Sequence, residues 1–406
     1  MPATVVIVGT LDTKGEEIGY VRQIIQESGC STIIVDVGTL NLPKMEPDIS
    51  RAQVAAAVGT TPEELLERAD RRLAVQTMID GGALTVKGLL DAGRLSGILS
   101  VGGGTGTHIG TGIMRSLPLG IPKLMVSTVA SRDMSQLIGT KDIIMMHSVV
   151  DILGLNAISR RILANAASAI VGMVQSTVRI ESRKPLIGLT SFGFITEGAM
   201  RVKKKLEDRG YEVAPFHANG TGGIAIEDLI DHGLIRGVVD FALHEFADQM
   251  YGGYCGGIGP DRLESAGRRG IQQVVVPGGL DCIVLEFDSP ETIPPDMRDR
   301  KVFWYDFRSG VRTNQDDALH LAETIAEKLN RAKGPVKVVI PLDGWSEADS
   351  PNGPLCDPAT NGALVSELRS LLNSGIEIVE VKAHINDEEF AEKVACELDG
   401  LMKESR

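Results

Sequence analysis

Residues 4–37 read TVVIVGTLDTKGEEIGYVRQIIQESGCSTIIVDV, and this stretch decides the fold class. Thr4–Gly9 is a short apolar run, typical of a buried strand. Lys14–Ser28 places its apolar residues at helical spacing, and Ser31–Val37 is a second apolar run. A strand, a helix and a strand in this order predict a βαβ unit with parallel strands.

The same alternation runs through the rest of the chain. Further strands are predicted at 97–101, 123–128, 186–189, 211–216, 237–241, 273–276, 337–340 and 376–381. Helices are predicted at 156–176 and 196–208, after the N-cap Asp357, and from Asn386 to the end. We therefore predict an α/β fold with two Rossmann-like subdomains, mostly parallel sheets and a ligand cleft at the carboxyl ends of the strands.

An internal repeat supports two subdomains. Residues 90–98 (LDAGRLSGI) match residues 230–238 (IDHGLIRGV), and both patterns predict the end of a helix followed by the start of a strand. The first half carries extra residues, which we expect within 38–82. The polar, Pro-ended stretch 181–185 marks the boundary, which gives an N-terminal subdomain at 1–180 and a C-terminal one at 185–406.

Composition excludes several classes of protein. The 406 residues are 43% hydrophobic and carry a net charge of −13, which argues against disorder and against binding to nucleic acid or an anionic membrane. Five cysteines without C-x-x-C spacing argue against a disulfide scaffold and a zinc ribbon. The seven His include no close pair, so we assign no metal ligands. No signal peptide is recognised at the start, and we expect a cytoplasmic protein.

Two loops of the first half are candidates for binding an anion. Thr10, Asp12, Thr13 and Lys14 follow the first strand at the start of a helix, where free backbone N–H groups favour negative charge. The segment Gly102-Gly103-Gly104-Thr105-Gly106-Thr107 follows a later strand, and its glycines would let a phosphate approach the backbone. An N-cap with a surface Lys, and a tight strand–helix turn, remain the alternative interpretations of these two loops.

The second half offers a similar loop and a set of polar side chains after its strands. Gly220, Thr221, Gly222 and Gly223 repeat the Gly-Thr-Gly pattern, and we interpret them as the loop that matches Gly102–Thr107. Candidates for acting on a second ligand are His217, His244, Glu245, Asp281 and Arg308. His244 is either a general base or a hydrogen-bonded loop residue, and Asp281 either holds Mg²⁺ or a ribose hydroxyl or forms an Asx turn.

Several motifs in a fixed order resemble those of a known family. They are VGTLDTKGEE (8–17), SVGGGTGT (100–107), HANGTGG (217–223), VPGGLD (276–281), PLDGWS (341–346) and HINDEEF (384–390). In this order they resemble the ATP-binding domain family of the tomato mosaic virus resistance protein, and the resemblance covers essentially the whole chain. It implies two Rossmann-like subdomains, a homodimer, and ATP, with Mg²⁺ as an accompanying ion. By motif match, the ATP contacts fall on Thr10–Lys14 and Gly102–Thr107, and with less support on Gly220–Gly223.

One stretch departs from that family. Residues 304–313 (WYDFRSGVRT) stand where the family has a segment containing His-Asn-Pro before a Leu-Met-Arg. If that segment acts on a second substrate, the substrate of this chain differs or is lost.

Three functional hypotheses remain open on the sequence. The first is an ATP-binding protein with the nucleotide on the loops of the first half. The second is an ATP-dependent or Mg-dependent enzyme that acts on a small phosphorylated or carboxylated metabolite between the subdomains. The third is a regulatory module that uses ATP as a switching ligand.

Overall fold

The N-terminal part of the computed structural model is built on a five-stranded sheet, and every neighbouring pair of its strands is parallel. The strand order is β2-β1-β3-β4-β5. The strands are β1 (Thr4–Gly9), β2 (Ser31–Asp36), β3 (Gly97–Gly102), β4 (Lys123–Ser127) and β5 (Ile143–His147). The structure describes residues 2–178 and 184–404, so residues 181–183 of the predicted boundary stretch 181–185 lie outside the described residues.

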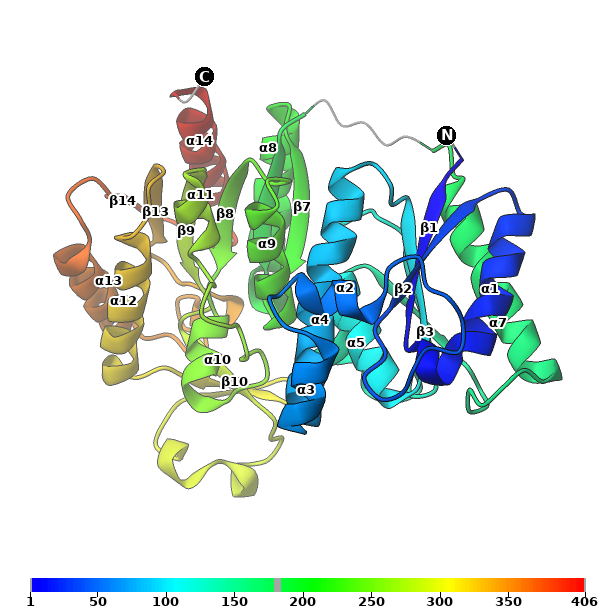
Figure 1. Ribbon diagram of the computed structural model, residues 1–406. Coiled ribbons are helices and arrows are strands. Elements are labelled where there is room, and N and C mark those ends of the chain that lie inside the picture. The colour runs from blue at the N-terminus through cyan, green and yellow to red at the C-terminus, as the bar shows by residue number, and fades with distance from the viewer. Residues whose placement is uncertain (1, 179–183, 405–406) are drawn as a thin grey trace. The chain divides into compact units, whose positions relative to one another are not determined.

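Helices cover both faces of this sheet (Figure 1). Successive residues of β1 point to opposite faces, so Val5 and Ile7 join one core while Val6 and Val8 join the other. The first core is closed by α1 (Leu11–Glu27) and α7 (Ala157–Val174), and the second by α4 (Arg71–Asp91) and α5 (Gly104–Arg115). Three short helices complete this part of the chain: α2 (Arg51–Ala56), α3 (Pro62–Arg68) and α6 (Ser135–Ile138).

By length and composition alone, α7 could cross a membrane. Its apolar residues Leu163, Ala166 and Ile170 lie in the core beneath the sheet, and a core helix passes the same test.

The C-terminal part repeats the same strand order with one strand added. Its parallel sheet has the order β14-β13-β9-β8-β6-β7. The strands are β6 (Leu186–Ser191), β7 (Glu212–His217), β8 (Gly237–Ala242), β9 (Gln272–Gly278), β13 (Val336–Pro341) and β14 (Glu377–Val381). A small antiparallel sheet, in the order β10-β12-β11, is inserted before β13; its strands are β10 (Cys282–Leu285), β11 (Val302–Trp304) and β12 (Ser309–Arg312).

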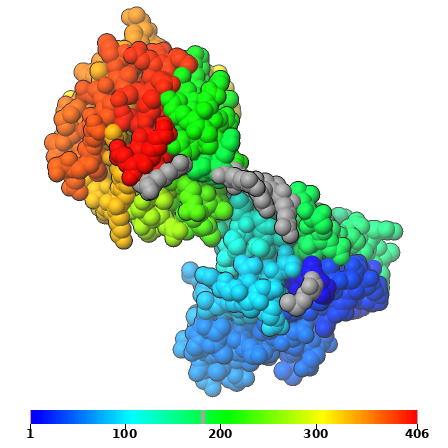
Figure 2. Space-filling view, turned by 90° about the horizontal axis from the view of Figure 1, so that it is seen from above, coloured from blue at the N-terminus to red at the C-terminus, as the bar shows by residue number. Residues whose placement is uncertain are grey.

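Helices again pack on both faces of the large sheet. One face carries α8 (Thr196–Asp208) and α14 (Glu388–Glu404). The other face carries α9 (Thr221–Asp231), α11 (Ser265–Arg269), α12 (Gln315–Leu329) and α13 (Pro358–Leu371), and α10 (Glu245–Tyr251) follows β8. The two parts are compact units, which Figure 2 colours from blue at the N-terminus to red at the C-terminus. Each unit has hydrophobic cores of its own. The predicted fold class, two Rossmann-like α/β subdomains, is confirmed.

The internal repeat is present in three dimensions. Helix α4 ends at Asp91 and β3 begins at Gly97, while α9 ends at Asp231 and β8 begins at Gly237. The glycine after each helix is left-handed, with φ of 66° at Gly93 and 73° at Gly233. Helices α2 and α3, within the segment predicted to be extra, have no counterpart between β7 and α9.

The same topology overturns one prediction. The loop Gly220–Gly223 follows β7, the second strand of its unit, whereas Gly102–Thr107 follows β3, the third strand of the other. The two Gly-Thr-Gly loops are therefore not equivalent, and the counterpart of Gly102–Thr107 is the segment that contains His244 and Glu245. The sequence comparison paired the two loops because both are rich in glycine. Glycine is also required where backbone segments pack closely, and a Cβ on Gly222 would lie 1.8 Å from the His217 carbonyl oxygen.

Two helix starts also differ from prediction. Helix α1 begins at Leu11 with a kink at Lys14, so Lys14 lies inside its first turn. Helix α14 begins at Glu388, because the Asn386 side chain binds elsewhere: it accepts from the Gly198 N–H and donates to the Phe194 carbonyl. The N-cap at Asp357 is confirmed.

Candidate functional site

A polar crevice opens in the N-terminal unit where the strand order reverses. Chain connections leave β1 and β3 toward opposite faces of the sheet, which is the usual ligand site of such folds. The crevice has a volume of about 220 Å³. It is lined by Thr10, Asp12, Thr13, Lys14, Thr39, Leu40, Arg71, Gly103, Gly104, Thr105 and Gly106.

The first turn of α5 forms one wall of this crevice. Gly103 is its N-cap in an extended conformation, and no side chain in the described part of the chain caps the turn. The backbone N–H groups at the start of a helix carry partial positive charge and bind anions when nothing else accepts from them. The wall can therefore hold a phosphate or carboxylate.

Two of the six predicted residues in this segment have structural roles. Thr107 is fully buried, and its hydroxyl lies 2.7 Å from the Ser127 hydroxyl. A Cβ on Gly102 would lie 2.8 Å from the Gly106 Cα, so glycine is needed there for packing. The residues that line the crevice are Gly103, Gly104, Thr105 and Gly106.

Two cationic side chains line the crevice. Lys14 is half-buried and, within residues 2–178 and 184–404, has no ion-pair partner. The Arg71 guanidinium donates a hydrogen bond to the Thr105 hydroxyl at 3.3 Å. Thr10 and Thr13 add two hydroxyls that lie 2.9 Å apart. This set of donors matches the acceptor oxygens of a phosphate chain.

Asp12 has a different role from its neighbours. Its Oδ2 accepts from the N–H groups of Leu40 and Asn41, while Oδ1 is buried without a partner among the described residues. The nearby Asp36 accepts from the N–H groups of Leu11 and Gly38, and burial raises the pKa of Asp36. The two carboxylates therefore hold together the loops that follow β1 and β2.

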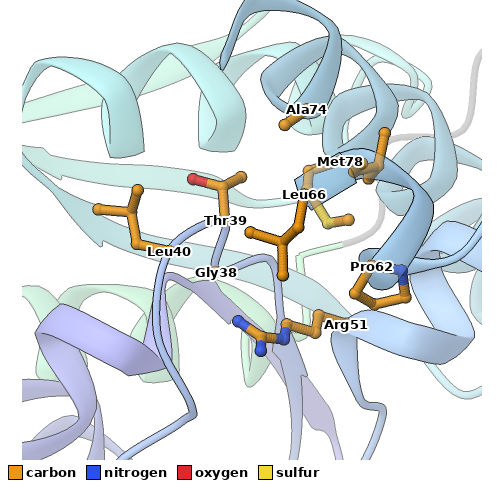
Figure 3. Close-up of a pocket in the computed structure, with 9 residues that line it drawn as sticks. Gly38, Thr39, Leu40, Arg51, Pro62, Leu66, Ala74 and Met78 are labelled. Atoms are coloured by element: carbon orange, nitrogen blue, oxygen red, sulfur yellow. The ribbon is translucent and has the colours of Figure 1, made fainter. Parts of the chain in front are cut away.

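A small apolar pocket adjoins the crevice and shares Thr39 and Leu40 with it. Its volume is about 30 Å³. Figure 3 shows Gly38–Leu40 on one side of it and residues of α3 and α4 on the other. It is lined by Gly38, Thr39, Leu40, Arg51, Pro62, Leu65, Leu66, Ala74 and Met78. The exposed Leu40 and Leu66 side chains extend this apolar surface outward.

Sequence reasoning missed the residues of the segment between β2 and β3. Thr39, Leu40 and Arg71 come from this segment, which has no strand pattern and no glycine motif. One signal could have indicated these residues: they lie in the segment 38–82, predicted to be an addition to the first half, and this segment follows a strand whose carboxyl end lies at the same edge of the sheet.

A second cavity, of about 120 Å³, lies at the equivalent place in the C-terminal unit. Phe192, Gly193 and Phe194 follow β6 and His244 follows β8, the two strands between which this sheet reverses its order. The remaining lining residues are His217, Cys255, Val284, Tyr305 and Arg308. The cavity thus brings together three of the five predicted second-ligand residues: His217, His244 and Arg308.

Arg308 is the cation of this cavity. Its guanidinium pairs with Asp306 at 2.7 Å and lies over the rings of Tyr254 and Tyr305. Arg308 belongs to the stretch that departs from the family pattern, so the departure falls on the wall of this cavity.

The other two candidates lie in buried polar clusters that do not line this cavity. Glu245 pairs with the buried Arg262 at 2.8 Å and accepts from the Gly220 N–H. Asp281 accepts from the Ser346 hydroxyl at 2.6 Å. Burial and the neighbouring Asp349 raise the pKa of Asp281 to about 7, although Arg312 opposes the shift.

Comparison with known proteins assigns both halves of the chain to one family. Residues 3–179 match the Uncharacterised protein family (UPF0261) N-terminal domain, and residues 184–402 match its C-terminal domain. A UPF0261 protein of Clostridium tetani is 42% identical over 99% of this chain and 100% of its own length. The ToMV resistance protein Tm-1(GCR237) of Solanum lycopersicum is 35% identical over 95% of this chain and 54% of its own length.

Among solved structures, a UDP-N-acetylglucosamine 2-epimerase from Rickettsia bellii is 11% identical, with coverage of 100% of this chain and 96% of its own. Its TM-score of 0.23 is too low to equate the two folds. The sequence relatives confirm the resemblance to the virus-resistance protein. With both of its halves matched in order, the chain belongs to the Uncharacterised protein family UPF0261.

Proposed function

We propose that this protein binds ATP in the N-terminal crevice, with the phosphates on the first turn of α5. The observation that carries this proposal is the uncapped start of α5, with Lys14 and Arg71 lining the same crevice. A helix N-terminus with two cations suits a polyanion better than a neutral ligand.

The adjoining apolar pocket favours a nucleotide over a simple phosphate. Thr39 and Leu40 line both spaces, so one ligand can contact both. The pocket is small, so only an edge of an adenine ring would enter it, and the ring would lie against Leu40 and Leu66. A nucleotide has this combination of an apolar base and charged phosphates.

Mg²⁺ would enter with the phosphates. In nucleotide sites this ion is usually held by one or two carboxylates and by phosphate oxygens. Asp12 lines the crevice, and its Oδ1, which has no hydrogen-bond partner among the residues that the structure describes, is the carboxylate oxygen left to hold such an ion.

Calorimetric titration tests the proposal with the full-length chain, using Mg-ATP, adenosine and inorganic triphosphate as separate ligands. Lys14→Ala should weaken ATP and triphosphate by about tenfold or more, because it removes a charge-assisted hydrogen bond. Lys87→Ala, an exposed cation on α4, is the matched control and should bind as the parent does. Equal ATP affinity in the parent and Lys14→Ala would place the nucleotide elsewhere.

A second candidate function is catalysis on a small phosphorylated or carboxylated molecule. The C-terminal cavity favours it, since Arg308 offers a cation for such a group next to His217 and His244. Appearance of ADP in the titrated sample, dependent on an added metabolite, would support an ATP-dependent enzyme. ATP bound without turnover would favour the regulatory module.

A further inference from the structure

Three side chains of metal-binding type meet at the wall of the C-terminal cavity. His244, Asp248 and Cys255 are buried, and their potential ligand atoms all lie within 4.8 Å of one another. His244 and Cys255 also line the cavity itself. This cluster lies in the C-terminal unit and is separate from the proposed ATP site.

The backbone brings these residues together. His244 immediately precedes α10 and Asp248 lies one helical turn later. The Asp248 carboxylate then accepts from the N–H groups of Cys255 and Val284, each at 2.7 Å. Gly253 permits this approach, because a Cβ there would lie 2.8 Å from the Asp248 carboxyl carbon. The loop that carries Cys255 is thus held against α10 by the carboxylate itself.

The imidazole of His244 is the anomaly that a metal ion would resolve. It is fully buried, and neither ring nitrogen has a hydrogen-bond partner among the described residues. The ring stacks on Phe192 with centroids 4.3 Å apart, which fixes its plane. A buried polar group without a partner destabilises the folded state, so such groups in native proteins generally have a purpose.

The separations are near those of a coordinated ion. His244 Nδ1 lies 3.8 Å from Asp248 Oδ1. Two N and O ligands of tetrahedral Zn²⁺ are about 3.4 Å apart, given bond lengths near 2.1 Å. The potential ligand atoms of all three residues lie within 4.8 Å of one another, so small rotations of the side chains would bring them to such spacings.

We propose that His244, Asp248 and Cys255 form a binding site for Zn²⁺ or a similar divalent transition metal. One imidazole, one carboxylate and one thiolate are a ligand set that suits Zn²⁺ and excludes Mg²⁺. Sequence reasoning looked for close pairs of His, and it missed this site because the site contains a single His. Sequence spacing shows only His-x3-Asp-x6-Cys.

Three protein ligands leave one position of a tetrahedral ion open, as in catalytic zinc sites. The cavity that His244 and Cys255 line also contains Arg308 and Tyr305. The open position therefore faces a space in which a cation can hold an anionic group. We infer that the ion accepts a water molecule or an oxygen of a small carboxylate or phosphate compound there.

Cobalt titration of the chelator-treated, full-length protein tests the site. We expect one equivalent of Co²⁺ to bind, to give a thiolate-to-cobalt charge-transfer band, and to be displaced by Zn²⁺. Cys255→Ser should abolish the band, and Cys255→Ser and His244→Asn should each weaken binding by about tenfold or more. Cys356→Ser and Cys396→Ser, which change the two less buried thiols, should keep both the band and the affinity.

Two outcomes would overturn the proposal: folded parent protein that binds no Co²⁺, or a charge-transfer band that persists in Cys255→Ser. If Cys255→Ser does not fold, X-ray absorption of the zinc-loaded parent decides the question. A zinc ion with one sulfur ligand and further nitrogen and oxygen ligands supports the site, and a coordination sphere without sulfur refutes it. None of these results depends on whether ATP binds.

Discussion

The carboxylate of Asp12 accepts a hydrogen bond from the backbone N–H of Leu40 at 3.0 Å. This contact joins the loop after β1 to the loop after β2 and fixes the wall that the crevice shares with the apolar pocket. Asp12, whose position suggests a ligand contact, therefore also anchors the loop that forms this wall.

Replacement of Asp12 should increase the mobility of the loop that follows β2. In Asp12→Ala, two backbone N–H groups lose their acceptor, and we expect a loss of about 1–3 kcal/mol in unfolding free energy. Limited proteolysis should show faster cleavage within 38–44. Asp12→Asn keeps one acceptor oxygen and should be cleaved more slowly than Asp12→Ala. Unchanged proteolysis in Asp12→Ala would contradict the anchoring role of Asp12, whether or not ATP affinity is lost with the proposed Mg²⁺ contact.

Two glycines near the crevice, Gly102 and Gly104, allow the effect of a substitution on packing to be distinguished from its effect on ATP binding. A Cβ on Gly104 meets nothing within 4 Å, whereas one on Gly102 meets the backbone of Gly106 at 2.8 Å. Gly104→Ala should leave stability unchanged or raise it by up to about 1 kcal/mol, since alanine favours helix. It should nevertheless weaken ATP binding, because the methyl group occupies the crevice.

Gly102→Ala should lower stability, and chemical unfolding combined with ATP titration measures both effects. Parent-like ATP affinity in Gly104→Ala would mean that the phosphates do not approach this turn.

Much of the fold follows from the sequence because its strands are buried on both faces. Thr4–Gly9 is predicted to the residue, since every position after Thr4 is apolar or Gly and is buried. The strand order then gives the crevice, because carboxyl ends on either side of the reversal must lie together. The sequence places Thr10–Lys14 and Gly103–Gly106 after strands, and the strand order, which it does not predict, brings them to one crevice.

Local sequence patterns do not predict which side chains pair when they are far apart in the sequence. Arg71 reaches Thr105 across 34 residues from a segment without strand pattern, and Glu245 meets an Arg262 that no motif singles out. Glu245 is a second-ligand candidate when read beside His244 in the sequence, but its pairing with the buried Arg262 determines its role. The antiparallel sheet β10–β12 was missed because its strands have only three or four residues.

Arg262 should be indispensable to the C-terminal unit. Its fully buried guanidinium contacts the carboxylates of Glu227, Asp240 and Glu245 at 2.6–3.2 Å. Arg262→Met leaves these acids unpaired, and we expect a loss of about 3–5 kcal/mol or failure to fold. Arg268→Met is the control, since Arg268 pairs with exposed acids and should cost at most about 1 kcal/mol. Urea denaturation compares the two, and equal losses would contradict this assignment.

Asp281 should make stability fall as pH rises. Its pKa of about 7 in the folded protein lies above its ordinary value of 3.8, because burial and Asp349 disfavour the charge. Between these values the folded state binds more protons than the unfolded state, so the contribution of Asp281 is complete below the lower value and lost above the upper one.

Asp281→Asn keeps an acceptor for the Ser346 hydroxyl and never ionises. The variant should therefore gain about 1 kcal/mol or more over the parent between roughly pH 5 and pH 8, with a plateau at higher pH. Subtracting the two urea denaturation profiles cancels the titration of all groups that do not interact with Asp281, so the difference reports Asp281 together with its neighbour Asp349. A difference that is flat across this range would show that Asp281 is ionised throughout and that Arg312, 4.0 Å from the Asp349 carboxylate, compensates both acids.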